Sequence, residues 1–420
     1  MTTADIHRTI ETVWKIEAPR LIAGLAHMLR DVVQAEDLAQ EALLVALEHW
    51  PHDGVPDNPG AWLMTTAKRR AIDLMRHHRM QDDKHAAFGH ELEPETMTHA
   101  PDDADALDDD IGDDLLRLIF TACHPVLGRD MQVALTLRML GGLSTPEIAR
   151  AFLVSEPTVA QRIVRAKRTL ASKQVPFEVP RGEELAPRLT SVLEVVYLIF
   201  NEGYTATAGD DWARPALCEE AMRLGRVLAT LAPREPEVHG LVALMDIQAS
   251  RLHARTAADG TPILLLDQDR SRWDHLLIRH GLAALERAHA LGGADGNYAL
   301  QADIAACHAR AVHAENTDWA RMASLYARLA VLTPSPVVEL NRAVAVSMAE
   351  GPAAGLVLVD ALREERVLTG YHLLPSVRGD LLYKLGRIDE ARTEFERAAA
   401  LTGNAREAAL LRQRAARCDP

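Results

Sequence analysis

The sequence predicts an all-α protein built from several helical modules, and two observations support this prediction. Alanine, leucine, arginine and glutamate dominate the 420 residues, and all four favour helices. Apolar residues recur at helical spacing along most of the chain, and no segment shows the sustained alternation of a strand. One stretch, TPILLLDQ at 261–268, is typical of a short extended piece. The length allows two or three domains with hydrophobic cores.

Composition excludes several classes of protein. No run of about 18 apolar residues is present to span a bilayer. The first residues, MTTADIHRTIETVW, lack a signal-peptide pattern, so we expect a cytoplasmic protein with no membrane partner. The cysteines are widely spaced and form no C-x-x-C pair, which argues against a zinc site or disulfide framework and fits a reducing compartment. They are Cys123, Cys218, Cys307 and Cys418.

The net charge of −14 is distributed very unevenly along the chain. Residues 1–60 carry a net −6, residues 61–81 a net +4 and residues 82–114 a net −12. Residues 115–179 then carry +5, and the remainder carries −5. Two basic segments therefore flank a strongly acidic one, a pattern that the total conceals.

The first module, residues 1–81, is predicted to consist of amphipathic helices interrupted once by the turn-rich segment Trp50–Gly60. Before this break, AEDLAQEALLVALEHW places polar residues and one leucine on a single face, which is either a solvated face or a docking surface for a protein. These residues are Asp37, Gln40, Glu41, Leu44 and Glu48.

After the break, NPGAWLMTTAKRRAIDLMRHHRM forms a cationic helix, for which Asn58 and Pro59 suit the start. Trp62 is either a core anchor or, beside so many cations, a platform for displaced bases on a nucleic-acid backbone. The tract RHHRMQDDKH is a solvated helix end or, as the weaker alternative, a metal-binding tract. The cations are Lys68, Arg69, Arg70, Arg76, His77, His78 and Arg79.

Residues 82–114 contain few large apolar side chains and are predicted to form a flexible acidic linker. A second compact module, residues 115–175, contains LSTPEIARAFLVSEPTVAQRIVRAK. Ser144 and Glu147 have the spacing of a capping box, and Ser155 starts a second helix whose apolar stripe is Val159, Ile163, Ala166 and Leu170. This pattern is typical of a helix-turn-helix that binds DNA, with a solvated hairpin as the alternative. The polar face carries Glu156, Thr158, Gln161, Arg162 and Arg165, followed by Lys167 and Arg168.

A proline-bearing joint at 175–187 leads into a C-terminal extension, residues 181–420, which we divide into helical segments 181–290 and 291–420. In VRGDLLYKLGRIDEARTEFERAAALTG, five positions have the spacing of a tetratricopeptide unit, in which small residues let two helices approach. They are Gly379, Gly386, Ala391, Phe395 and Ala398. An ordinary helical hairpin is the alternative to a helical-repeat array.

Together, AEDLAQEALLVALEHW, NPGAWLMTTAKRRAIDLMRHHR and LSTPEIARAFLVSEPTVAQRIVRAKRTL resemble regions 2 and 4 of an extracytoplasmic-function (group 4) sigma factor of the sigma-70 family. In the extension, YLIFNEGY, RPALCEEAMRLGRVL, LLLDQDRSRWD and TPSPVVELNRAVAV resemble the ECF42 subgroup, which carries a tetratricopeptide-like extension. The resemblance spans nearly the whole chain. It implies a sigma region 2 bundle, a flexible acidic linker, a sigma region 4 helix-turn-helix and a long repeat domain.

The resemblance also implies partners and roles. The helix with Asp37, Gln40, Glu41 and Leu44 would bind the β′ coiled-coil of core RNA polymerase, and region 4 would lie at the β flap. The segment from His52 to Gly60 and the helix with Trp62 would capture and open the −10 element of promoter DNA. The helix after Ser155 would bind the −35 element, with Arg162 and Arg165 leading. Here Leu153 and Pro157 stand where relatives often carry glycine.

Two other classes of function remain as alternatives. One is a tetratricopeptide adaptor with no promoter role, and the other is a hydrolytic or metal enzyme. The sequence argues against an enzyme, because it contains no H-x-x-x-H set with a matching acid, no phosphate loop and no nucleophile elbow, and it predicts no cofactor and no metal. The extension is expected to regulate the sigma modules in cis or to bind a regulatory protein.

Overall fold

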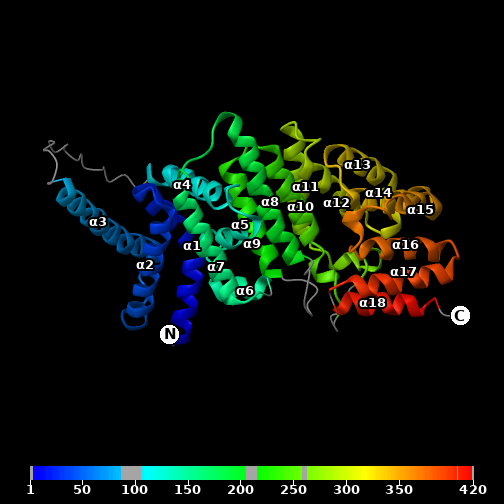
Figure 1. Ribbon diagram of the computed structural model, residues 1–420, viewed down its shortest axis with the longest axis horizontal. Coiled ribbons are helices and arrows are strands. Elements are labelled where there is room, and N and C mark those ends of the chain that lie inside the picture. The colour runs from blue at the N-terminus through cyan, green and yellow to red at the C-terminus, as the bar shows by residue number, and fades with distance from the viewer. Residues whose placement is uncertain are drawn as a thin grey trace. The chain divides into compact units, whose positions relative to one another are not determined.

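The computed structural model describes residues 3–86, 106–152, 154–204, 215–257, 263–403 and 405–418. The regular structure of these residues is helical, with no strand, which confirms the all-α prediction (Figure 1). The stretch 261–268, expected to be extended, instead holds a 3-10 turn at Leu265–Asp267, while residues 261–262 lie outside the described residues. The chain divides into two compact units, Met1–Val195 and Val196–Pro420.

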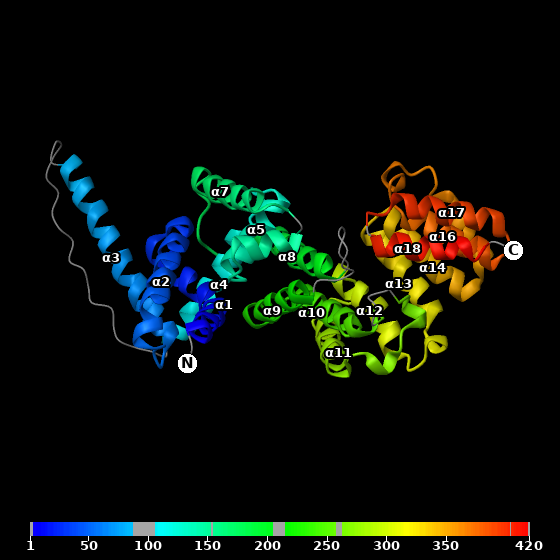
Figure 2. The same cartoon turned by 90° about the horizontal axis from the view of Figure 1, so that it is seen from below.

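The described part of the first unit contains helices α1 to α7 and the start of α8, which are labelled in Figure 1 and, except for α6, in Figure 2. They are α1 (Thr3–Leu29), α2 (Val32–Asp53), α3 (Pro59–Ala86), α4 (Ala106–Ala122), α5 (Arg129–Met139), α6 (Thr145–Phe152), α7 (Glu156–Ser172) and α8 (Leu185–Tyr204). The division between the units falls within α8, later than the joint at 175–187 that the sequence suggested.

Helices α1, α2 and α3 pack against one another as a bundle. The buried face of α2 is rich in alanine, which lets α1 approach closely. The break between α2 and α3 lies at Gly54–Asn58, and Gly54 has a positive φ of 87° that suits glycine at a helix end. Asn58 Oδ1 accepts a hydrogen bond from the Ala61 amide at 3.0 Å, as expected for a helix start.

The expected linker, 82–114, is helical at both ends. Residues 82–86 belong to α3, and residues 106–114 form the first half of α4, so the prediction of a linker is wrong for these stretches. Helix α4 is anchored by Leu118, Ile119 and Phe120, which are buried, and α4 packs against α1. Once the buried residues have formed a first helical turn, adding further turns costs less free energy than nucleating a new helix, so α4 continues back into the acidic residues. Residues 87–105 lie outside the described residues.

Helices α5, α6 and α7 form the second module of this unit. The capping box is present at the start of α6: Glu147 Oε2 accepts from the Ser144 amide at 2.8 Å, and Ser144 Oγ accepts from the Glu147 amide at 3.4 Å. Ser155 Oγ likewise accepts from the Thr158 amide and caps α7. The apolar stripe predicted for α7 is buried, whereas Leu153 lies outside the described residues.

The second unit continues from α8 through ten further helices. They are α9 (Pro215–Leu231), α10 (Pro236–Ala249), α11 (His275–Ala290), α12 (Asn297–Arg310), α13 (Trp319–Leu332), α14 (Pro336–Glu350), α15 (Pro352–Ala361), α16 (Leu373–Lys384), α17 (Ile388–Leu401) and α18 (Ala405–Ala416). Successive helices pack on each other, as α13 on α14 and α14 on α15. The four cysteines of the chain lie in its described part, where they are buried and form no disulfide bond with one another.

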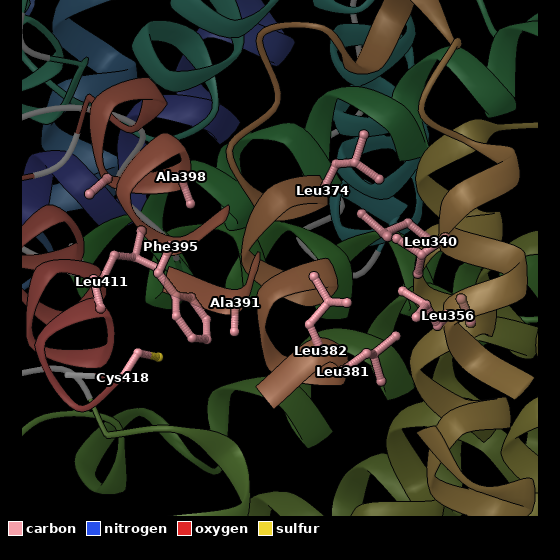
Figure 3. Packing of buried hydrophobic residues seen from close by; sticks show 14 of the residues in the cluster. Leu340, Leu356, Leu374, Leu381, Leu382, Ala391, Phe395, Ala398, Leu411 and Cys418 are labelled. Carbon is pink, nitrogen blue, oxygen red and sulfur yellow. The ribbon is translucent and has the colours of Figure 1, made fainter. Parts of the chain in front are cut away.

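Helices α16 and α17 form a closely packed hairpin (Figure 3). Gly386 turns the chain between them with a φ of 76°. A Cβ at Gly379 would lie 2.9 Å from Cε1 of Phe395, so only glycine leaves room for this ring. Phe395, Ala391 and Ala398 are buried in the same cluster as Leu381 and Leu411. The small-residue and aromatic spacing found in the sequence therefore produces a close helix pair. No described helix combines the length and the apolar character that crossing a bilayer requires.

Candidate nucleic-acid interface

Helix α7 presents the polar face expected to bind the −35 element. Glu156, Gln161, Arg165 and Arg168 are exposed on it, and Thr158 is half-buried beside its capping partner Ser155. The helix has a buried stripe that seats it on α5 and α6 and an outer face available to a ligand. Such an arrangement allows side chains to reach base edges without disturbing the core.

Two cations of this face are already engaged within the protein. Arg162 Nη2 donates to Asp130 Oδ2 of α5 at 2.6 Å. Lys167 Nζ donates to Asp37 Oδ1 of α2 at 2.8 Å and also to Glu36. Burial by itself lowers the pKa of Lys167, but Glu36 and Asp37 outweigh it and raise that pKa above its ordinary value.

Glu36 lies at the centre of this ion-pair group. Its side chain is only 2% exposed, and its carboxylate accepts from Arg138 Nε at 3.1 Å, from Lys167 and from Gln40. A buried carboxylate of this kind is tolerated only while its cationic partners remain in place. The group ties α2 of the bundle to α5 and α7 of the second module.

A second tie joins α1 to α6. Lys15 Nζ lies 2.9 Å from Glu147 Oε1. Burial raises the pKa of Glu147. Hydrogen bonds from the Ser144 amide and hydroxyl and the charge of the Lys15 ammonium together outweigh burial, so the pKa lies below its ordinary value. The capping carboxylate of α6 therefore also pairs with the first helix.

Helix α3 carries the cationic face expected at the −10 element. Lys68, Arg69 and Arg76 are exposed, and Asn58 is exposed at its start. Arg70 is paired with Glu41 of α2. The backbone of α3 extends through His77 and Arg79, but the side chains of these two residues lie outside the described part of the chain.

A cavity of about 580 Å³ lies where α2, the following turn and α3 meet. Trp50 and Trp62 line it, with ring centroids 5.3 Å apart in an edge-to-face arrangement, and Arg69 and Arg70 border it. Trp50 is 2% exposed, and its indole Nε1 has no hydrogen-bond partner among the described residues. Trp62 is half-buried, so it is a wall of this cavity as well as a packing partner of Trp50. A cavity lined by aromatic rings and bordered by cations suits a nucleotide, since its base stacks on the rings and its phosphate pairs with the cations.

The face expected to dock on polymerase lies on α2. Asp37, Glu41 and Leu44 are exposed, Leu44 at 59%, and Gln40 is half-buried. Two of these residues are partnered within the protein, Asp37 by Lys167 and Glu41 by Arg70. The structure thus brings residues of all three expected surfaces into contact within the first unit.

Three residues that are central to these surfaces were not identified from the sequence, namely Glu36, Arg138 and Trp50. Glu36 falls among the buried positions Ala35, Leu38 and Ala39, and a carboxylate within an apolar stripe is the signal that could have identified it. Nothing in the local sequence points to its partner Arg138, which is 102 residues away.

Comparison with family models finds three domains in the chain. Residues 14–80 match Sigma-70 region 2, and residues 117–170 match Sigma-70 region 4. Residues 188–289 match a family of unknown function, DUF6596. The first two matches cover the bundle and the helix-turn-helix module described above.

Two curated proteins illustrate the similarity. The uncharacterized protein R00370 of Rhizobium meliloti (strain 1021) is 45% identical over 400 residues, which cover 94% of this chain and 92% of that protein. The ECF RNA polymerase sigma factor SigK of Mycobacterium ulcerans (strain Agy99) is 27% identical over 155 residues, or 36% of this chain and 78% of that protein.

Proposed function

Since this chain belongs to the sigma-70 homologues and is a sigma factor that directs transcription initiation, we propose a division of that work among its surfaces. In this proposal it acts in the bacterial cytoplasm as a binding subunit of RNA polymerase. The pair of basic faces on α3 and α7, one on each matched sigma region, is the observation that carries it.

Helix α7 binds the −35 element in the major groove. Arg165 and Gln161 are exposed on its outer face and supply the hydrogen-bond donors that base edges accept. Arg168 contributes to phosphate binding. Arg162 and Lys167 join them once their ion pairs with Asp130 and with Glu36 and Asp37 exchange for DNA phosphates.

Helix α3 and the turn before it bind the −10 element. A base displaced from the duplex enters the cavity that Trp50 and Trp62 line, where stacking on the half-buried Trp62 offsets the cost of unpairing. Lys68, Arg69 and Arg76 hold the backbone of the opened strand. Asn58 supports this surface by capping the helix that carries it. His77 and Arg79, placed here by the sequence alone, extend the same basic helix.

The exposed face of α2 binds the β′ coiled-coil of core polymerase, with Leu44 as its apolar centre and Asp37, Gln40 and Glu41 around it. An exposed leucine within a ring of polar groups is a common form of protein docking site. Region 4 binds at the β flap. Because Asp37 and Glu41 are paired with Lys167 and Arg70, docking on polymerase releases Arg70 for promoter DNA and leaves Lys167 held by Glu36 alone.

The C-terminal extension regulates these modules in cis. Its close hairpin of α16 and α17 supports a tetratricopeptide-like repeat array, in which each helix pair buries apolar surface against the next pair. The same feature supports membership of the sigma subgroup with such an extension. A separate regulatory protein bound to the extension is the competing form of control.

The test is run-off transcription with purified core polymerase on a promoter library, together with core co-purification. The full chain should bind core polymerase and direct transcription from a defined subset of promoters. A truncated chain ending at Tyr204 retains Arg188 and Ser191, whose hydrogen bonds to the Phe120 and Cys123 carbonyls support the first unit. This chain should still bind polymerase with an altered promoter output. Failure of the full chain to bind core polymerase would favour the adaptor alternative, and unchanged output after truncation would remove the regulatory role.

A further inference from the structure

The second unit contains a cavity of about 490 Å³ among α8, α10, α12, α13 and α14, all of which are labelled in Figure 1. This volume lies in the range of small-molecule sites in proteins. Helices α10, α12, α13 and α14 pack consecutively around it, so the cavity is held by regular structure. It is separate from the DNA- and polymerase-binding surfaces proposed above, because every residue that lines it belongs to the second unit.

The charges that line the cavity are strongly one-sided. Arg251 is a lining residue, and none of the described residues that line the cavity is an aspartate or a glutamate. The Arg251 guanidinium lies 5.8 Å from the centre of the Tyr204 ring and 5.9 Å from that of Trp273. Its Nε is buried without a hydrogen-bond partner, and no carboxylate among the described residues pairs with it. A cation held by aromatic rings and left without an anion is a ready site for a negatively charged group.

His308 supplies a second unpaired polar group. It lines the cavity and is 7% exposed, and its Nδ1 has no hydrogen-bond partner among the described residues. Burial, followed by the charges of Arg251 and Arg270, lowers the pKa of His308 to about 3. The imidazole is therefore neutral at physiological pH, so Arg251 supplies the positive charge of the lining. A buried polar atom without a partner is costly, and a ligand that bonds to it recovers that cost.

The rest of the lining combines hydroxyl and carboxamide groups with an apolar wall. Tyr326 is one of the hydroxyls, and burial raises its pKa to about 12, so it remains protonated. Asn341 and Thr333 are exposed and form the opening. The polar members are Tyr197, Gln248, Asn297, Gln301, Tyr326, Thr333 and Asn341. The apolar wall consists of Leu265, Ile304, Leu329, Val337 and Val338.

We propose that this cavity binds a small organic carboxylate with an apolar body. The carboxylate pairs with the Arg251 guanidinium, His308 and the carboxamides bond to its polar edge, and the body lies against the leucine, isoleucine and valine side chains. Most ligand sites have this composition, an apolar wall with a few convergent polar groups. The proposal concerns the second unit alone and holds whether or not the surfaces of the first unit act as proposed above.

The experiment uses the full chain and a matched pair of probes, phenylacetate and phenylacetamide, which differ in charge and hardly in shape. Binding is measured by titration calorimetry and by tryptophan fluorescence, since Trp273 lies beside Arg251 and Trp319 packs against His308 at 5.2 Å between ring centroids. We expect phenylacetate to bind at least about tenfold more tightly than the amide, because only the carboxylate pairs with the guanidinium. Equal binding of the two probes, or binding of neither, would overturn the proposal.

Two variants locate the binding. Arg251→Gln should abolish the preference for phenylacetate. Because that change also removes contacts to aromatic rings, Asn341→Asp provides a second variant that adds a negative charge at the exposed opening. It should weaken phenylacetate binding about tenfold and leave the amide unaffected. Asn316→Asp, at an exposed position of the same unit that does not line the cavity, is the matched control. Equal effects of Asn341→Asp and Asn316→Asp would place the probe elsewhere and overturn the proposal.

A third probe, the dipeptide Phe-Leu with a free carboxyl end, tests a peptide as the occupant. Binding of the dipeptide no tighter than that of phenylacetate supports a small carboxylate. If the dipeptide binds about tenfold more tightly than phenylacetate, and the dipeptide amide does not, the ligand of the cavity is the carboxyl end of a polypeptide and not a small molecule.

Discussion

Lys167 of α7 lies 2.8 Å from Asp37 of α2, and this ion pair joins the helix proposed to bind the −35 element to the helix proposed to dock on polymerase. The same ammonium pairs with Glu36, which is buried and also held by Arg138. The two proposed binding surfaces of the first unit therefore share one cation. If these surfaces bind as proposed, association with polymerase and DNA exchanges the internal ion pairs for external ones, at a cost that the new contacts have to exceed.

Glu36→Gln should lower the stability of the first unit by about 3 kcal/mol, because it leaves Arg138 and Lys167 facing each other without their shared anion. The measurement is urea unfolding of the full chain, combined with hydrogen exchange in α2 and α7. Glu48→Gln, an exposed position of the same helix, should change stability by less than about 0.5 kcal/mol. Equal effects of the two substitutions would show that the Glu36 group contributes nothing.

Lys167→Met should tighten binding to core polymerase about fivefold, since it frees Asp37 while the methionine retains the apolar stem of the lysine. The dissociation constant can be measured by fluorescence anisotropy with labelled protein. Lys173→Met, at the exposed end of the same helix, serves as the control and should have no effect. Urea unfolding of Lys167→Met is measured alongside, because the change also removes one cationic partner of the buried Glu36. A weaker complex with unchanged unfolding would mean that the lysine itself contacts polymerase.

Arg165→Ala should reduce promoter binding by the reconstituted holoenzyme by about 1–3 kcal/mol, because its exposed guanidinium is proposed to bond to base edges. The loss should be confined to promoters that share one −35 sequence. Arg363→Ala removes an exposed arginine from the second unit and should leave DNA binding unchanged. A uniform loss over all sequences would instead assign Arg165 to the phosphate backbone.

Gly379→Ala should destabilise the hairpin of α16 and α17 by about 1–3 kcal/mol, since the added Cβ would lie 2.9 Å from the Phe395 ring. Thermal unfolding of the full chain should show this as an earlier loss of the second unit. Gly370→Ala is the control, because a Cβ at that position meets nothing within 4 Å. If both variants melt alike, the close helix approach is not a source of stability.

The first unit should lose part of its stability in acid through Glu147. The Ser144 and Lys15 contacts lower the pKa of this carboxyl below its ordinary value of 4.5 despite partial burial. Its contribution is therefore present above that value and is lost as the pH falls through the lowered pKa. Glu147→Gln should be less sensitive to acid than the unchanged chain in hydrogen exchange of α6. If the variant and the unchanged chain lose stability equally in acid, Glu147 does not contribute to the acid sensitivity of the first unit.

The local structure of this protein could be predicted from its amino-acid sequence. The helices, the capping box of Ser144 and Glu147, the cap at Ser155 and the buried stripe of α7 all depend on contacts between residues three or four positions apart, so helical spacing was sufficient to predict them. The acidic segment was predicted less well. Its composition argued against a helix, but packing of its apolar end against α1 carried α4 back to Ala106.

The pairing of charges and the positions of the cavities, by contrast, follow from how the helices pack in three dimensions. Glu36 meets Lys167 across 131 residues of sequence, and the cavity beside Arg251 is assembled from α8 to α14. Such pairings depend on how whole helices pack, and side-chain spacing along the chain carries no information about them. The polar face of α7 could be recognised from its spacing, but the pairing of its Lys167 with α2 follows from the fold.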